Sequence, residues 1–170
     1  MLFNLGLLVG GVLVIGFMLG IALGSDTLEW RGFGALGMLT GLAVILVGLY
    51  PVDDFDPHMI AAIAAFAGIA LLAAWFAGWV IAGDAPYPRG LGVLAVWVVI
   101  AMVAFLAFPN LVQPEHPFAE GSDPTPLPRP DVWLAALLEW VVIGSALAWI
   151  ALPAWHDQSR TIGATKEARA

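Results

Sequence analysis

The sequence predicts an all-α fold, a polytopic transmembrane helix bundle with about five spans. Hydrophobic residues make up 61% of the 170 residues and charged residues 11%, and the mean hydropathy is +0.93. These values lie outside the usual range of soluble globular domains. The apolar residues form continuous runs close to the roughly 20 residues that a helix needs to cross a bilayer. A membrane β-barrel would instead show alternating segments of about ten residues.

Charged and proline-rich segments separate the predicted spans. The spans are expected at about residues 2–24, 32–50, 57–83, 91–108 and 132–152. Together they form one transmembrane helical bundle, residues 1–155, followed by a polar, frayed tail over residues 156–170. The connection over residues 109–131 contains seven prolines, and no helix persists through that density of proline.

Basic residues in the connections predict the orientation of the chain. On the side reached after the first span lie Arg31, Arg89, Arg160, Lys166 and Arg169, whereas the other side has Arg129 alone. By the positive-inside rule the first of these sides is cytoplasmic. We therefore expect a multi-pass protein of the cell membrane with its N-terminus outside, its C-terminus in the cytoplasm and its proline-rich connection outside.

Glycines recur along the first two predicted spans. They are Gly6, Gly10, Gly16, Gly20 and Gly24 in the first span, and Gly37 and Gly41 in the second. Ridges of small residues let helix backbones approach each other closely. Helix contact within one protomer is the simpler interpretation, and a homo-oligomer formed through these Gly-rich helix faces is the alternative.

The segment over residues 48–58, GLYPVDDFDPH, places three carboxylates and a histidine between two apolar runs. An Asp at the N-cap and a proline at the first helical position are typical of a helix start. We therefore interpret Asp56, which precedes Pro57, as a structural cap of the third span. Asp131, which follows Pro130, is expected to cap the fifth span in the same way.

Asp53 and Asp54 are expected to be solvated turn residues, and a metal site is the alternative. Together with His58 they offer oxygen and imidazole ligands to a divalent ion, although their spacing matches no strong metal motif. The chain contains no cysteine, which excludes disulfides, thiolate nucleophiles and Cys-based metal centres. We predict no cofactor and assign no catalytic residue.

Glu139 is a carboxylate inside a predicted span, about 10 Å from its start, where an ionised side chain is costly. We expect it to face the bundle interior or to stay neutral. Asn4 and His58 belong to the same outer half of the bundle, which predicts an Asn4–His58–Glu139 polar cluster. A hydrogen-bonded group that only fixes helix packing is the alternative, and His58 by itself is equally compatible with a side chain that reaches lipid headgroups.

Aromatic residues and absent motifs limit the function further. We expect tryptophans to act as anchors near the membrane boundaries rather than as a cofactor site. On the inner side these are Trp30, Trp75, Trp79, Trp149 and Trp155, and on the outer side Trp133.

The sequence contains no phosphate loop, nucleotide fingerprint, nucleophile elbow or zinc helix. A net charge of −7 without a basic patch argues against nucleic acid.

A family resemblance rests on the segments MLFNLGLLVGG, GLYPVDDFDPHMIAAIAAF and LLEWVVIGSALAW. They resemble the domain-of-unknown-function 998 (DUF998) family of prokaryotic multi-pass membrane proteins over most of the chain. The resemblance implies no biochemical activity, because the family has none established. Family members usually carry an additional N-terminal span and a Ser-Asp-Leu-Gly-type segment before a Phe-Asn-x-Gly-Leu stretch. Residues 3–7 of this chain match the Phe-Asn-x-Gly-Leu stretch. We therefore expect a shortened member or a start assigned too far downstream.

Acidic composition adds an expectation about the source. The isoelectric point is about 4.6, and one lysine and five arginines stand against 13 acidic residues. This usage resembles that of haloarchaeal proteins, in which an excess of exposed acid favours solubility at high salt. We therefore expect an archaeal, halophilic source, and a high-GC bacterium is the alternative.

Three classes of function fit the sequence. The first is a non-enzymatic integral membrane protein of the cell envelope that binds lipid or a partner, and the composition favours it. The second is a small proton-coupled transporter that uses Glu139 and His58. The third is an outward-facing metal-dependent membrane hydrolase with His58, Asp53 and Asp54 as metal ligands and Glu139 as general base.

Cysteine labelling tests the orientation, because the chain has no cysteine of its own. In Asp54→Cys an impermeant thiol reagent added to intact cells is expected to label the protein. In Ser159→Cys labelling is expected only after the membrane is opened. The reverse pattern would contradict the orientation that the basic residues predict.

Overall fold

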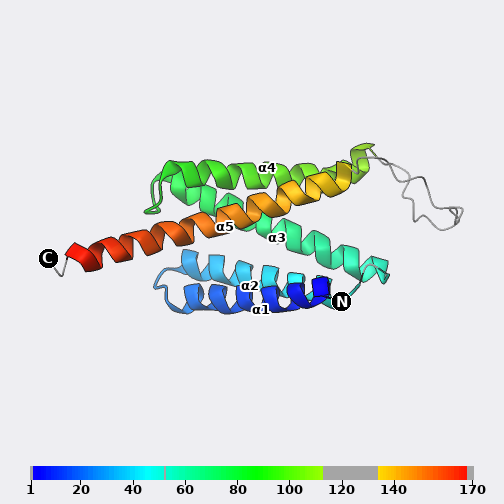
Figure 1. Cartoon of the computed structure of the whole chain (residues 1–170), viewed down its shortest axis with the longest axis horizontal. Helices are drawn as coiled ribbons and strands as arrows, with labels where there is room; N and C mark the ends of the chain where they lie inside the picture. The colour runs from blue at the N-terminus through cyan, green and yellow to red at the C-terminus, as the bar shows by residue number, and fades with distance from the viewer. Residues whose placement is uncertain (1, 52, 113–133, 168–170) are drawn as a thin grey trace, which may run out of the picture. The chain divides into compact units, whose positions relative to one another are not determined.

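The computed structural model describes residues 2–51, 53–112 and 134–167. Five helices follow one another along this part of the chain: α1 (Leu2–Leu23), α2 (Leu28–Leu49), α3 (Phe55–Ala82), α4 (Arg89–Val112) and α5 (Leu134–Glu167) (Figure 1). Every regular element among the described residues is a helix, which confirms the predicted all-α fold.

Four of these helices are long and apolar enough to cross a membrane, namely α1, α2, α3 and the part of α4 from Arg89 to Ala107. In α5 the apolar stretch among the described residues is shorter, Leu137–Pro153. The helices thus have the lengths and composition of a multi-pass membrane protein, and a crossing by α5 stays a prediction.

The chain divides into two compact units. The first unit, Met1–Ala85, contains α1, α2 and α3, and the second unit, Pro86–Ala170, contains α4 and α5. Each unit has its own buried residues, so each is described by itself.

In the first unit α1 and α2 lie side by side along most of their length (Figure 1). A Cβ atom added to Gly11 would lie 2.7 Å from the carbonyl oxygen of Gly41, and one added to Gly41 would lie 3.0 Å from the carbonyl oxygen of Gly11. A Cβ added to Gly48 would lie 2.9 Å from the carbonyl oxygen of Asn4. The two backbones therefore meet closely at positions where a side chain would not fit, as at other small-residue helix contacts.

The glycines predicted as a ridge of the first span face elsewhere. A Cβ added to Gly6, Gly10, Gly16 or Gly20 would meet no atom within 4 Å. Gly20 follows Gly11 by nine residues, about 2.5 helical turns, so the two lie on opposite sides of α1. Gly11, which the predicted ridge did not include, is the α1 glycine that contacts α2. In α2, by contrast, Gly37 and Gly41 both face α1.

The contact between α2 and α3 also depends on small residues. Thr40 is 5% exposed and lies against Gly68, where an added Cβ would clash with the threonine hydroxyl. The Thr40 hydroxyl donates a hydrogen bond to the carbonyl oxygen of Leu36 at 2.9 Å, so this buried polar group has a partner. Other buried residues of α3 are Ala61, Ala65, Leu72, Ala73, Phe76, Ala77 and Val80.

An aromatic cluster joins the start of α2 to the end of α3. The ring centroids of Trp30 and Trp79 are 4.4 Å apart, and Phe33, 5% exposed, meets the ring of Trp75 edge-on at 6.2 Å. Pairs of this kind contribute about 0.5–1.5 kcal/mol beyond the area they bury. Three tryptophans predicted as anchors near the inner membrane boundary thus also hold two helices together.

In the second unit α4 packs against α5. The buried side chains of these two helices include Ala95, Val98 and Met102 of α4 and Val142, Ala146 and Trp149 of α5. The indole N–H of Trp97 donates a hydrogen bond to the Ser145 hydroxyl at 3.0 Å. In the hydrocarbon core such a bond ties two helices together, because neither group finds water there.

Several helix ends differ from the predicted boundaries. The structure begins α2 at Leu28 rather than at residue 32, because the Thr27 hydroxyl caps the helix by accepting a hydrogen bond from the Trp30 N–H at 3.4 Å. At the other boundary α3 ends at Gly83, whose φ of 87° is the left-handed conformation that glycine adopts without strain.

Proline ends neither α4 nor α5. The structure continues α4 through Pro109 to Val112, where the sequence predicted an end at residue 108. It also continues α5 through Pro153 to Glu167, so this helix runs past the predicted span end at residue 152 into the segment expected as a polar tail. A proline inside a helix removes one hydrogen bond and disfavours the helix, but its φ is compatible with helical geometry.

A pair of neighbouring glycines tests the α1–α2 contact. Gly11→Ala is expected to lower the free energy of unfolding by about 1–3 kcal/mol, the typical cost of overfilling a well-packed contact. Gly10→Ala should change it by at most about 0.5 kcal/mol, as at other open positions. The measurement is unfolding of the purified protein in mixed micelles, and equal stability of the two variants would contradict the contact.

Candidate functional site

The turn between α2 and α3 forms through short backbone hydrogen bonds. Tyr50 closes α2, with its N–H donating to the carbonyl oxygen of Leu46 at 2.9 Å, and the Asp54 N–H donates to the carbonyl oxygen of Pro51 at 2.9 Å. The His58 N–H then donates to the carbonyl oxygen of Asp54 at 3.2 Å, which begins α3. The polar segment is therefore a compact turn.

The cap of α3 is Asp54 rather than Asp56. The helix begins at Phe55, and the Asp54 side chain makes no capping hydrogen bond. Asp56 and Pro57 are the second and third residues of α3. In this first turn the backbone N–H groups have no partner within the helix, so proline is tolerated two positions later than predicted. A carboxylate in the first turn still interacts favourably with the helix dipole. Asp131 lies outside the described residues.

His58 joins the first turn of α3 to the last residue of α2. Its Nδ1 atom lies 2.8 Å from the carbonyl oxygen of Tyr50. Because a carbonyl oxygen can only accept a hydrogen bond, Nδ1 is the protonated nitrogen and donates the bond. In the neutral ring Nε2 is then free of a proton and can accept a hydrogen bond. The side chain is half-buried. In this geometry His58 holds the turn closed.

The predicted metal ligands do not come together. Among the residues that the structure describes, no three His, Asp or Glu side chains form a group that could hold a metal ion. Asp53 and Asp54 are both exposed, and Nδ1 of His58 is already bonded to Tyr50. Nothing in this turn favours the metal-dependent hydrolase.

Two members of the predicted polar cluster belong to the first unit. The Asn4 backbone lies beside Gly48, near the C-terminal end of α2, and His58 bonds to Tyr50 at that same end. No hydrogen bond between Asn4 and His58 occurs within the described part of the chain. Glu139 is an exposed residue of α5 in the second unit, so its contact with the other two stays a prediction.

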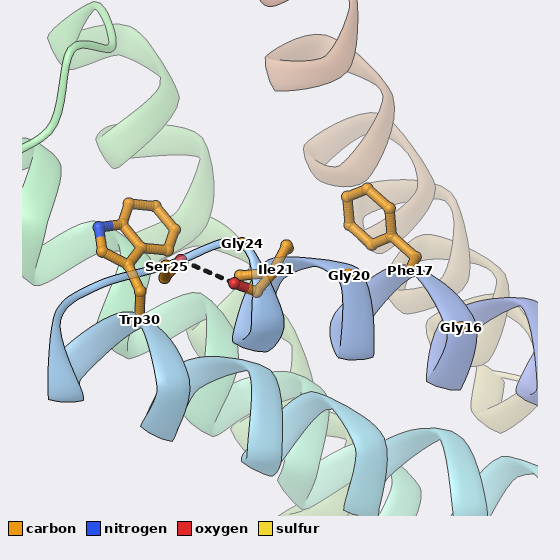
Figure 2. Close-up of a pocket in the computed structure, with 7 residues that line it drawn as sticks. All are labelled: Gly16, Phe17, Gly20, Ile21, Gly24, Ser25 and Trp30. Carbon is orange, nitrogen blue, oxygen red and sulfur yellow. Dashed lines mark hydrogen bonds between the residues drawn. The ribbon is translucent and has the colours of Figure 1, made fainter.

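A groove along the second half of α1 was not predicted. Its lining residues are Gly16, Phe17, Gly20, Ile21, Gly24, Ser25 and Trp30 (Figure 2). The groove is shallow and open, with a volume of about 540 Å³. Figure 2 shows Phe17 at one end and Ser25 with Trp30 at the other. Its lining is therefore apolar along the helix and polar at the turn that follows.

Side-chain hydrogen bonds hold the polar end of the groove. The Ser25 hydroxyl donates to the carbonyl oxygen of Ile21 at 2.7 Å, as Figure 2 shows. The Arg31 Nε–H donates to the carbonyl oxygen of Ser25 at 3.0 Å. This end coincides with the first charged residues after the apolar run of α1, a change of composition that is typical of the end of a membrane span.

The sequence did contain a signal for the groove. Gly16, Gly20 and Gly24 recur every four residues, which places them on one side of the helix, and a Cβ atom added to Gly16 or Gly20 would meet open space. Glycine spacing alone, however, predicts only that the helix surface is hollow there. It does not distinguish a surface that contacts a helix from one that receives another molecule.

Comparison with known proteins identifies a family. A family model described as "Protein of unknown function (DUF998)" matches residues 1–156, which include both the α2–α3 turn and the groove. No protein of curated function and no solved structure matches the chain.

Side-chain geometry at His58 gives a test of its structural role. His58→Ala removes the donor to Tyr50 and is expected to lower the free energy of unfolding by about 0.5–1.5 kcal/mol. His58→Asn places an amide N–H near the position of Nδ1 and should restore part of this loss, whereas His58→Gln should not. The measurement is unfolding in mixed micelles, and wild-type stability of His58→Ala would show that the bond contributes nothing.

Proposed function

The chain belongs to the DUF998 family of proteins of unknown function, and from that premise we propose that it is a non-enzymatic, multi-pass protein of the cell membrane that binds a membrane lipid. The observation that carries this proposal is the groove on α1, which is apolar along Gly16, Gly20 and Ile21 and ends at Ser25 and Trp30.

The length of the groove suits a lipid in one leaflet. Gly16 lies seven residues before Leu23, where α1 ends, which corresponds to about 10 Å along the helix axis, and Gly24 and Ser25 follow directly. The hydrocarbon core of a bilayer is about 30 Å thick, so one leaflet contributes about 15 Å. An acyl chain that runs from the polar end toward Gly16 therefore remains within the leaflet in which its headgroup lies.

The chemistry of the groove also suits an acyl chain. Glycines expose the helix backbone along its floor, and the side chains of Phe17 and Ile21 stand beside it (Figure 2). A flexible hydrocarbon chain fills such an irregular surface and gains many small dispersion contacts. The charge pattern of the connections predicts that Ser25 lies on the cytoplasmic side, so we place the lipid in the inner leaflet.

The other two functions gain no support from the described residues. A proton-coupled transporter requires His58 and Glu139 to act together, and His58 instead uses Nδ1 to hold the α2–α3 turn. The metal-dependent hydrolase requires a group of ligands that Asp53, Asp54 and His58 do not form. We therefore propose lipid binding without a chemical step.

Filling the groove tests the proposal. In proteoliposomes that contain a phospholipid with a photoactivatable acyl chain, cross-links are expected on α1 near Phe17 and Ile21. Gly20→Leu should lower the yield at these residues about tenfold, a change for which a loss of about 1.4 kcal/mol of binding energy suffices.

Gly10→Leu is the matched control, because a side chain at Gly10 also meets open space but lies outside the groove. Its cross-linking yield near Phe17 should equal that of the wild-type protein. Equal yields in Gly20→Leu and in the wild-type protein would contradict lipid binding in this groove.

A further inference from the structure

Charges of both signs surround the polar end of the groove. Asp26 follows Ser25 directly, and Glu29 and Arg31 flank Trp30. Ser25 and Trp30 themselves line the groove. Asp26, Glu29 and Arg31 are exposed. Residues that carry one guanidinium and two carboxylates thus adjoin, in the sequence, the two residues that line the polar end of the groove.

These charges are not neutralised within the fold. Across the described residues, neither Asp26 nor Glu29 forms an ion pair with Arg31. The Nε–H of Arg31 instead donates a hydrogen bond to the carbonyl oxygen of Ser25 at 3.0 Å. This bond holds the guanidinium beside Ser25, at the polar end of the groove. The terminal nitrogens of Arg31 remain as donors toward a ligand.

Trp30 adds a further donor at the same place. Its backbone N–H caps α2 by donating to Thr27, whereas its indole N–H has no partner among the described residues. Figure 2 shows the indole nitrogen on the side of the ring away from Ile21. A tryptophan at a membrane boundary typically keeps its ring in the apolar region and directs its N–H to headgroup or ester oxygens.

We infer that the groove selects a zwitterionic phospholipid, one whose headgroup carries both a phosphate and an ammonium group. This inference rests on the proposed function and names the class of lipid that the groove receives. The phosphate binds the guanidinium of Arg31, which matches phosphate geometry with paired donors. The ammonium lies near the carboxylates of Asp26 and Glu29.

Charge balance argues against a purely anionic headgroup. Asp26, Glu29 and Arg31 together carry a net charge of −1 (two carboxylates and one guanidinium), so an anionic headgroup gains one attraction and meets two repulsions. A zwitterionic headgroup carries the same phosphate and adds an ammonium group that the two carboxylates attract, which offsets these repulsions. Because these side chains are exposed, each attraction is modest and is weakened by salt.

The test compares two lipids with identical photoactivatable acyl chains in proteoliposomes of the full chain. One carries a phosphoethanolamine headgroup and the other a phosphoglycerol headgroup. The wild-type protein is expected to cross-link the phosphoethanolamine lipid about two- to fivefold more, the range that exposed ion pairs support. Raising the salt concentration should reduce this preference.

Two variants and a control assign the preference to the groove. The double variant Asp26→Asn with Glu29→Gln should lose the preference and keep its cross-links near Phe17, and Arg31→Gln should lower the yield of both lipids. Asp53→Asn removes an exposed carboxylate of the α2–α3 turn, at the opposite end of α2, and should leave the preference unchanged.

The outcomes separate this inference from the proposed function. Equal cross-linking of both lipids, or a preference for phosphoglycerol, overturns the headgroup inference while groove binding stands. A loss of preference in Asp53→Asn as large as that in the double variant also overturns it, because the effect would then not belong to the groove. Cross-links that do not depend on Gly20 for either lipid overturn the proposed function itself.

Discussion

The close approach of α1 and α2 is the constraint on which the rest of the first unit depends. Gly11 and Gly41 allow the two backbones to meet where any side chain would lie within about 3 Å of a carbonyl oxygen. This contact fixes the rotation of α1 about its own axis. Once Gly11 faces α2, helical geometry directs Gly16 and Gly20 to the opposite side, which is the side that carries the groove.

Each end of the α1–α2 pair is then held by a different set of polar contacts. At one end Thr27 caps α2, and Arg31 bonds to the Ser25 carbonyl oxygen, which fixes charged residues beside the groove. At the other end His58 bonds to the Tyr50 carbonyl oxygen and closes the turn into α3. The charged residues that follow α1 thus lie beside a groove that could receive a ligand, whereas no residue of the acidic turn between α2 and α3 lines that groove.

Run length and composition were sufficient to predict the membrane class and the all-α fold, because a continuous apolar run of about 20 residues has few other stable structures. They were insufficient to predict which glycines of α1 contact α2. Gly10 and Gly11 are equivalent in composition, and only the contact with Gly41 distinguishes them. Likewise, an Asp-Pro pair predicts a helix start but not its exact residue, and α3 begins directly after Asp54 rather than after Asp56.

The two-sided character of α1 is the central claim, and a nitroxide scan of α1 measures it most directly. The chain has no cysteine, so single cysteines at residues 9–22 can each carry one spin label in proteoliposomes. Collision with oxygen in the bilayer should be least at Ile15, Met18 and Ala22, which face α2, and greatest at Leu13, Gly16 and Gly20, whereas a label at Gly11 should disrupt the contact itself. A profile without helical periodicity, or one with its maximum at the α2-facing residues, would contradict the account.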